Sequence, residues 1–531
     1  MMNLRVAIAL AITLSTAACN GVLNPGGNAR ENGAVPDVPR MSRGGPSLAT
    51  VAVTIDPRSA SLATANKDIF GTNFATQMDM GNGDPRYTTM MAAFRQARFG
   101  LVRVPLALLS DYYDWRSNSF ASCVAKKWHL QSNTTFDVLM QQVAQPLGVD
   151  VNVTIDYGSN DNCTGGGDPT VAASWVDHAN NKMHYGIKYW SIGNEMYYGY
   201  PSVPPKCCGT PDFNVTRNNV NAGAAVYSNL IATKFYPLMK AKDPTIKIGV
   251  DLLAGNKIVG PRSQVWDSTV LAKAKYDFVE VHWYPDEMKD GTLLTSGVKY
   301  IVSSLAQVRS ELAAAGRPHT PIYLGEWGLT GTAQWSSIVG ALYTALTLGE
   351  LEKGGVGMGG TWQAWMSASC FMNQPGFYTK QTWSTDSLFE AIEGGTNPGC
   401  PSVVQPPLGT AFPRANAIAV VQGAFKDGDT VFAPTVKASI QTVKVYGARR
   451  ASGYGLLLVN INRNASASVA ITLVNDARTF TASTLAYDKW LYDKSENNVW
   501  AGPVSKSLGK VTKTFTVIIP EWSVTALTLA N

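Results

Sequence analysis

The sequence is poor in the features that assign many chains to a class. Charged residues make up only 15% of its 531 residues, and no run of five or more basic residues occurs. A nucleic-acid footprint is therefore not expected, and the net charge of +6 is a mild bias over this length. The H-E-x-x-H, G-x-S-x-G, C-x-x-C and P-loop patterns are also missing. No motif therefore supports a zinc protease, a serine hydrolase, a zinc ribbon or a P-loop.

One glycine-rich stretch imitates a dinucleotide-binding motif in the wrong context. Residues 355–360 match G-x-G-x-x-G. The stretch follows a helix-like segment and precedes a strand-like one, which reverses the order in a dinucleotide-binding unit. We therefore expect neither an organic cofactor nor a metal to be needed.

Long hydrophobic runs are missing as well. The apolar run 6–14 is about nine residues long, too short to span a bilayer. Arg5 precedes it, and the small residues Thr16–Ala18 follow it. This order predicts an export signal over residues 1–19, so we expect a protein of the cell envelope or a secreted one.

Cys19 directly follows the small residues of this signal. The arrangement resembles a bacterial lipoprotein box, which implies a lipid anchor at Cys19. An unmodified cysteine within an ordinary signal peptide is the alternative. Residues 20–48 are rich in Gly, Pro, Asn and Ser, and this composition predicts a disordered tether.

The length calls for two domains, and the residue pattern predicts what they are. Short apolar strands alternate with longer helical segments over residues 66–427, which predicts a (β/α)8 TIM barrel of the α/β class. The last helix is expected at 416–425. The predicted strands are 69–74, 101–105, 150–155, 187–194, 246–250, 278–283, 322–326 and 360–365.

Helical patterns disappear after the barrel. Residues 428–531 contain short strand-like segments separated by Gly, Asn and Asp turns, which predicts a β-sandwich. Residues 49–56 alternate like a strand but stand alone in the sequence. We therefore expect the segment 49–65 to supply an additional strand to this sandwich.

The strand-like segments that end at Glu195 and Glu326 carry the chemistry. Each segment is apolar and reaches a glycine and then the glutamate, with one asparagine between them at Glu195. They are the fourth and seventh of the eight strands, and all strand C-termini open on one face of a barrel. Two carboxylates about 5–5.5 Å apart across that face would act as acid/base and nucleophile of a retaining glycosidase. Ordinary solvated loop carboxylates are the alternative.

These two endings resemble glycoside hydrolase clan A, whose barrels carry catalytic glutamates on strands four and seven. The resemblance implies that Glu195 is the acid/base and Glu326 the nucleophile. Gly-Asn-Glu without a following proline is similar to the α-L-arabinofuranosidase and β-glucuronidase/heparanase-like families, which also carry a C-terminal β-sandwich. The Leu-Gly-Glu-Trp-Gly around Glu326 is more similar to cellulases.

The same resemblance implies roles for neighbouring polar residues. Arg103, in Val-Arg-Val-Pro at the end of the second strand, would bond the nucleophile and keep it ionised. Tyr284 would donate to the nucleophile, and His282 would reach the substrate or the acid. Asn194 would bind the sugar 2-hydroxyl. A surface salt bridge for Arg103 and a packed core position for His282 are the alternatives.

Several other strand-end residues are candidates for contacts with sugar. Trp365, Trp327 and Trp283 offer aromatic rings on which the apolar face of a sugar can stack. Asn73 and Asp156, at the ends of the first and third strands, are candidate polar contacts. For each tryptophan, a place in the core is the alternative.

The remaining cysteines fit an exported protein with disulfides. Six cysteines besides Cys19 allow fifteen pairings, and most of them follow predicted strands. They are Cys123, Cys163, Cys207, Cys208, Cys370 and Cys400. Cross-links there would stiffen loops on the catalytic face. Our working hypotheses are Cys123–Cys163 and Cys370–Cys400.

We therefore expect an exported retaining glycoside hydrolase that acts on a plant or microbial polysaccharide or oligosaccharide. An α-L-arabinofuranoside or a related cell-wall glycan is the favoured substrate. The alternatives are a non-catalytic glycan-binding envelope lipoprotein on a barrel scaffold and a structural envelope protein. The sugar, its anomeric configuration and the oligomeric state stay open.

Overall fold

The computed structural model covers most of the chain beyond the predicted export signal, which lies outside the described residues together with residues 20–47 of the tether. No helix in the described part is long and apolar enough to cross a membrane. The described residues are 48–531 except 75–82, 106, 126–129, 131–134, 202–209, 255–264, 286–287, 330–331, 367–368, 371–382, 385–387, 391–395, 398–399, 405, 439–440 and 498–500.

Eight parallel strands close into a barrel in which spatial order follows chain order. The predicted TIM barrel is therefore confirmed. Most strands are buried along their length, as is expected when side chains fill the barrel on one face and helices cover the other. The strands are β3 (Thr72–Asn73), β4 (Leu101–Val104), β7 (Asp150–Ile155), β8 (Tyr189–Ile192), β9 (Lys247–Leu252), β10 (Phe278–Trp283), β11 (Ile322–Trp327) and β12 (Met358–Thr361).

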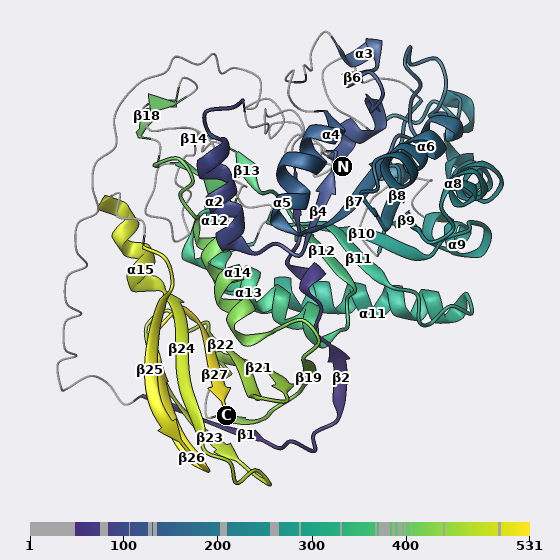
Figure 1. Ribbon diagram of the computed structural model, residues 1–531. Coiled ribbons are helices and arrows are strands. Elements are labelled where there is room, and N and C mark those ends of the chain that lie inside the picture. Colours follow the sequence, from purple (N-terminus) through teal and green to yellow (C-terminus); the bar gives the residue numbers. More distant parts are fainter. Residues whose placement is uncertain are drawn as a thin grey trace.

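Helices surround the barrel (Figure 1). Local chemistry starts several of them: Asp168 caps α6 by accepting the backbone N–H of Thr170, and Ser337 caps α13 by accepting that of Gly340. The longer helices are α2 (Tyr87–Ala97), α6 (Pro169–Val176), α7 (Gly223–Leu230), α8 (Tyr236–Lys242), α9 (Trp266–Lys273), α11 (Val298–Ala314), α13 (Ile338–Lys353) and α14 (Pro413–Ala424). Shorter ones include α3 (Ser122–Ala125), α4 (Phe136–Leu139), α5 (Gln145–Leu147), α10 (Asp290–Thr292), α12 (Thr332–Trp335) and α15 (Lys489–Asp493).

The eighth strand ends earlier than the sequence predicts. β12 stops at Thr361, and Trp365 belongs to a separate short strand, β13 (Trp365–Met366), which pairs with β16 (Phe389–Glu390). Residues 362–364 remain mostly buried beyond the strand, so burial does not mark where pairing stops. Placing Trp365 at the end of a barrel strand was therefore wrong, and its side chain lies outside the described part.

Two sheets form the C-terminal sandwich, and both take a strand from the segment before the barrel. In one sheet β1 (Ala49–Ile55) runs parallel to β23 (Ala467–Leu473), beside β20 (Thr435–Ala438) and β26 (Thr514–Ile519). The other sheet has the order β2 (Ser61–Thr64), β19 (Thr430–Phe432), β21 (Val443–Arg450), β22 (Gly453–Asn460), β27 (Ser523–Ala530), β24 (Phe480–Asp488) and β25 (Val504–Val511). The predicted sandwich is thus present, with the extra N-terminal strand in it.

Helices α13 and α14 lie between the barrel and the sandwich (Figure 1). α13 is buried on almost all sides, which explains why its sequence shows no polar face. Tyr446 on β21 donates to Glu350 of α13 at 3.0 Å, and Gln422 of α14 donates to the backbone of Ala97 at 2.9 Å. One continuous hydrophobic core runs from the barrel helices through α14 to the outer face of the seven-stranded sheet.

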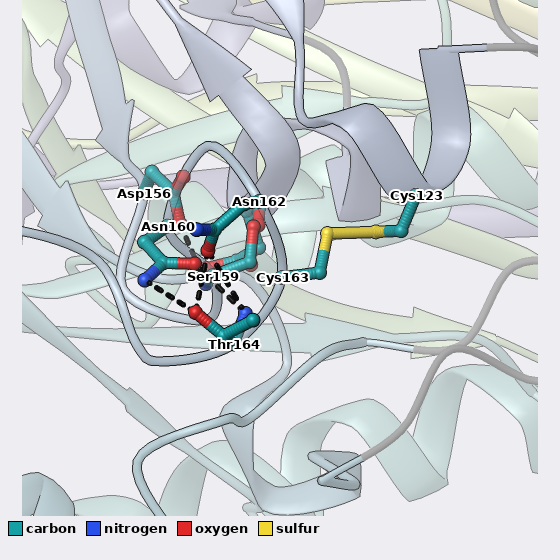
Figure 2. Close-up of a disulfide and its surroundings, with 8 residues drawn as sticks. Cys123, Asp156, Ser159, Asn160, Asn162, Cys163 and Thr164 are labelled. Atoms are coloured by element: carbon teal, nitrogen blue, oxygen red, sulfur yellow. Dashed lines mark hydrogen bonds between the residues drawn. A yellow bond between two sulfur atoms is a disulfide. The ribbon is translucent and has the colours of Figure 1, made fainter.

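The structure contains the disulfide Cys123–Cys163, whose Cα atoms are 6.1 Å apart. It joins α3 to the loop that follows β7 (Figure 2). This confirms one of the two hypothesised pairings. The side chains of Cys370 and Cys400 lie outside the described residues, so that pairing stays a prediction.

Candidate active site

The barrel interior is layered from apolar to charged. Its floor consists of apolar side chains of four strands, namely Leu101, Phe278, Tyr323 and Met358. Two residues further along the strands, inward side chains become polar, with Arg103 on β4 and Glu280 on β10. The period of two along a strand places them on the same inner face. His282 and Glu326 follow at the open end.

Arg103 is the hub of this interior and has no exposed surface. Its Nη1 donates to Oε1 of Glu326 at 2.9 Å, and its Nη2 donates to Oδ1 of Asn194 at 2.8 Å. Nη1 also donates to Oδ1 of Asn73 at 3.2 Å. The planar guanidinium thus donates hydrogen bonds to one residue of β11, one at the end of β8 and one of β3.

Glu280 is a second buried carboxylate that the sequence analysis did not single out. Its Oε1 lies 2.9 Å from Nε of Arg103 and 3.0 Å from Nε2 of His282, and Ser191 donates to its other oxygen. A Cβ at Gly325 would lie 2.0 Å from Oε1 of Glu280. The glycine before Glu326 therefore makes room for this carboxylate inside the barrel.

The chain around Glu195 is bent sharply and held on both sides. Gly193 has φ 77° and Glu195 has φ 51°, so two residues adopt left-handed conformations. The backbone N–H of Asn194 donates to Asp111 at 2.8 Å, and that of Met196 donates to Asp251 at 3.1 Å. These two buried carboxylates fix the direction in which Glu195 leaves the strand.

Glu195 and Glu326 meet across the mouth of the barrel. One carboxylate oxygen of each and a ring nitrogen of His282 all lie within 4.8 Å of one another. Nδ1 of His282 is 3.1 Å from Oε1 of Glu195 and 3.7 Å from Oε2 of Glu326. Tyr197 donates to Glu195 at 3.3 Å, and Tyr284 donates to Glu326 at 3.2 Å.

The electrostatics of the site follow from burial and close charges. Burial raises the pKa of Glu326, and the charges of His282 and Arg103 act against this rise. Burial acts to lower the pKa of His282, but the surrounding carboxylates outweigh it and raise that pKa to about 10. Burial acts to raise the pKa of Glu280, yet Arg103 and His282 dominate and leave it below its ordinary value. His282 is therefore a cation between carboxylates at neutral pH.

The cluster of Glu195, His282 and Glu326 is also a set of metal-ligand types. Both oxygens of Glu326 already accept hydrogen bonds, from Arg103 and Tyr284, and a protonated His282 has no lone pair to offer. These contacts suit an anionic carboxylate that faces an electrophilic carbon better than they suit a cation site.

The other residues predicted to contact sugar lie in different environments. Trp327 has no exposed surface, and Trp283 is 8% exposed and donates to Tyr343. A platform role for Trp327 is therefore wrong, because packing leaves no ring face for a sugar. Asn73 is buried and donates to the backbone of β11 and β12, so it braces the strands. Asp156 lies at the end of β7 and lines a separate side cavity.

Several residues at the site escaped the sequence analysis. Glu280 could have been found, because Glu280, His282 and Tyr284 follow the period of two that faces one side of a strand. Trp362 directly follows β12 and is half-buried. A Cβ placed on Gly328 would meet both the ring of Tyr284 and the Cβ of Trp362, so these two residues lie near each other. Asp111 lies in the segment between β4 and β5 rather than at the end of a barrel strand, and it carried no signal.

Comparisons with known proteins agree with this architecture. No family model matches the sequence, and no curated protein matches it either. Among solved structures, an α-L-arabinofuranosidase from Thermotoga maritima shares 14% identity at a TM-score of 0.64, covering 90% of this chain and 100% of that one.

Two further solved structures are similar. The bifunctional glucanase-xylanase CelM2 from a metagenome library has a TM-score of 0.58 and 14% identity, covering 91% of this chain and 99% of that one. A Paenibacillus polymyxa xyloglucanase of glycoside hydrolase family 44 has a TM-score of 0.56 and 13% identity, covering 91% and 100%. The chain therefore has the barrel-and-sandwich fold of these structures, as its resemblance to clan A implied.

Proposed function

We propose that the protein is a retaining glycoside hydrolase in which Glu326 is the nucleophile and Glu195 the acid/base. The observation that carries the proposal is the approach of the two carboxylates, with oxygen atoms within 4.8 Å of each other at the ends of β8 and β11. Retaining enzymes need a separation of about 5–5.5 Å, whereas inverting enzymes need about 6.5–9.5 Å to admit a water.

In the first step, an oxygen of Glu326 attacks the anomeric carbon and the bond to the leaving oxygen breaks. The proton of the Glu195 carboxyl moves to that oxygen, so the leaving sugar departs as an alcohol. Arg103 and Tyr284 hold Glu326 in position for this attack. The product of the step is a glycosyl ester on Glu326.

In the second step, water attacks the same carbon from the side that the leaving group vacated. Glu195, now a carboxylate, takes the proton of this water, and the ester bond to Glu326 breaks. Both glutamates return to their starting states. Two inversions at one carbon give net retention.

Asn194 is suited to bind a hydroxyl group of the sugar. Its carbonyl oxygen accepts from Arg103, while its buried Nδ2 has no hydrogen-bond partner in the described part of the chain. An amide N–H₂ beside the two carboxylates can donate to the 2-hydroxyl, an interaction that strengthens in the transition state. An unpaired buried amide is costly, which favours a substrate partner for it.

The substrate is proposed to be a plant or microbial glycan, with an α-L-arabinofuranoside as first choice. Solved structures similar to this one are named arabinofuranosidase, xyloglucanase and glucanase-xylanase. Trp362 replaces Trp365 as the candidate platform, because it follows β12 and is not fully buried. The sandwich would buttress the barrel.

Export to the cell envelope, with a lipid anchor at Cys19, is proposed from the N-terminal residues alone. Labelled palmitate should enter the wild-type protein and not Cys19→Ser. A secreted, unlabelled wild type would instead indicate an ordinary signal peptide.

The test of the activity is hydrolysis of aryl arabinofuranoside, xyloside, glucoside and glucuronide by wild type, Glu195→Ala and Glu326→Ala. Wild type should cleave at least one, and each variant should lose most of that rate. Azide should rescue Glu326→Ala with a glycosyl azide of inverted configuration, because azide replaces the nucleophile directly. If wild type binds glycans but cleaves none, the protein is a glycan-binding barrel instead.

A further inference from the structure

A cavity of about 140 Å³ lies on the catalytic face, outside the site described above. None of the described residues that line it is Glu195, Glu326, Arg103 or His282. Three segments form its walls: the hairpin of β5 (Tyr113–Asp114) and β6 (Ser119–Phe120), the loop that follows β7, and one face of α6 with its capping residue Asp168. It is much larger than the space a single water needs, and it is of the order of a cavity that holds one six-membered ring.

The cavity begins one strand away from the acid/base. Asp156, which lines it, directly follows Ile155, and Ile155 of β7 pairs with Ile192 of β8. Adjacent strands are about 4.8 Å apart, so the same face of the barrel carries both places. Asp111 joins them, because its two oxygens accept the backbone N–H groups of Tyr157 and Asn194 at 3.0 and 2.8 Å.

The walls are tied together before any ligand arrives. The disulfide Cys123–Cys163 links α3, which follows the hairpin, to the loop after β7 (Figure 2). Within that loop Asn160 and Asn162 bond Thr164 (Figure 2). Arg116 of the hairpin lies 3.8 Å from Asp161 of the loop. A pre-formed cavity lowers the ordering cost of binding.

The lining combines aromatic and polar groups. Tyr113, Trp115 and Trp175 supply the apolar side, with the rings of the two tryptophans stacked at 5.8 Å. Asp156 and Asn160 supply polar groups. Trp175 is only 2% exposed, and its Nε1–H has no hydrogen-bond partner among the described residues. That nitrogen is itself buried, so the polar groups that a ligand in the cavity can reach are those of Asp156 and Asn160.

The charges of the lining residues limit the classes of ligand that the cavity can bind. Four aspartates and one arginine are among the described lining residues, namely Asp114, Asp156, Asp161, Asp168 and Arg116. This excess of negative charge disfavours an acidic sugar. The aspartates do not converge as metal ligands do, since the described part of the chain brings ligand atoms of three such residues together only at Glu195, His282 and Glu326. A neutral polyol meets both conditions, because its hydroxyls can donate to the carboxylates and it carries no charge of its own.

We propose that this side cavity is a subsite for one neutral sugar unit of the glycan chain, beside the point of cleavage. The inference rests on the proposed glycosidase function for its biological meaning, but the binding itself can be measured without catalysis. The subsite would make the protein favour neutral oligosaccharides over single aryl glycosides and over uronic-acid chains.

The experiment uses the full chain with Glu195→Gln, so that ligands are not consumed. Calorimetry and tryptophan fluorescence follow titration with arabinotriose, xylotriose, cellotriose, trigalacturonate and calcium chloride. Ala172→Leu fills the cavity from α6, since Ala172 lines it and is 2% exposed. The matched control is Ala241→Leu on the exposed face of α8.

We expect at least one neutral trisaccharide to bind, and Ala172→Leu to weaken it at least tenfold, while Ala241→Leu leaves the affinity unchanged. Trigalacturonate and calcium should give no heat. Asp156→Asn is the second variant, in case Ala172→Leu unfolds, and it should weaken binding several-fold. Equal affinity in the cavity variants and the parent, or no binding of any neutral trisaccharide, would overturn the proposal.

The remaining outcomes separate this inference from the proposed function. Calcium or trigalacturonate binding that Ala172→Leu abolishes would also overturn it, because the occupant would then be a cation or an acidic sugar. Cavity-dependent sugar binding by a wild type that hydrolyses nothing would leave the subsite standing while the glycosidase proposal fails. Hydrolysis by the wild type, together with sugar binding that the cavity variants do not weaken, would support the glycosidase proposal and overturn the subsite.

Discussion

The carboxylate of Glu280 lies 2.9 Å from Nε of Arg103 inside the barrel, and neither side chain has exposed surface. The guanidinium therefore sits between two carboxylates, Glu280 on its inner side and Glu326 at the mouth. The same oxygen of Glu280 is 3.0 Å from His282. Glu280 thus supports both cations that contact Glu195 and Glu326, without reaching the mouth itself.

Glu280→Gln should alter the pH profile and destabilise the fold. Loss of this negative charge removes support for protonated His282, so its pKa falls from about 10 and the basic limb of activity moves to lower pH. Breaking a buried ion pair from one side also costs about 3–5 kcal/mol in the free energy of unfolding. Kinetics against pH and urea unfolding check both effects. Glu280→Asp keeps the charge and should retain the basic limb; an unchanged limb in Glu280→Gln would reject the positioning role.

Arg103→Lys should be severe although it preserves charge. A lysine ammonium is a single point and cannot hold Glu326 and Asn194 at 2.9 and 2.8 Å together. We expect kcat/KM to fall at least about 100-fold, as when a charge-assisted bond worth 2.7 kcal/mol or more is lost. Steady-state kinetics measures it, with Arg95→Lys on the exposed face of α2 as the control. A loss of kcat/KM under threefold would contradict the requirement that one guanidinium holds both Glu326 and Asn194.

Glu352→Gln should stabilise the protein in alkaline solution. Burial raises the pKa of Glu352 from 4.5 to about 8, and the backbone N–H of Asn66 opposes this rise only in part. The unfolded chain keeps the lower value, so the stability from this protonated group is complete below pH 4.5 and is lost as the pH rises through 8.

The glutamine variant lacks this titration. It should match wild type at pH 4.5 and exceed it at pH 9 by an amount on the order of a few kcal/mol. Urea unfolding at the two pH values gives the comparison. Equal curves at pH 9 would show that Glu352 is not held neutral.

Replacing Cys123 and Cys163 with serine should lower stability. The bridge spans 40 residues, for which chain entropy in the unfolded state predicts a loss of about 4 kcal/mol. Thermal unfolding of the variant under oxidising conditions gives the value. Reducing agent should destabilise wild type by at least as much, and any further effect on the variant would reveal another bridge, such as Cys370–Cys400. A variant as stable as wild type would show that the bridge is dispensable.

Much of the fold could be predicted because strand and helix periods are local properties. The positions of the eight strands followed from short apolar runs, although the first is shorter than predicted because Lys67–Phe70 forms a 3-10 helix. The two glutamates stood out because carboxylates directly after buried strands are unusual. The end of the eighth strand could not be predicted, because side chains beyond Thr361 are buried by the barrel mouth and look apolar in either case.

The predicted stacking of a sugar on Trp327 was wrong for a related reason. Sequence shows that Trp327 ends a strand, but the face on which its ring lies depends on neighbours from other elements. The structure buries it completely, whereas Trp362, one residue after β12, keeps some exposure. Whether an aromatic residue is core or platform is set by packing, which a single segment does not contain.

The sequence by itself determined the barrel, the sandwich and the two strand-end glutamates, since each depends on the order of residues within one segment. Only the tertiary structure decided that Arg103, Glu280 and His282 form one charged network, in which Arg103 and Glu326 are 223 positions apart in the chain. It also decided that Gly325 leaves space for Glu280 and that a tied side cavity opens beside β7. These relationships arise because closing the sheet brings distant strand ends into a volume where only certain charges and sizes fit together.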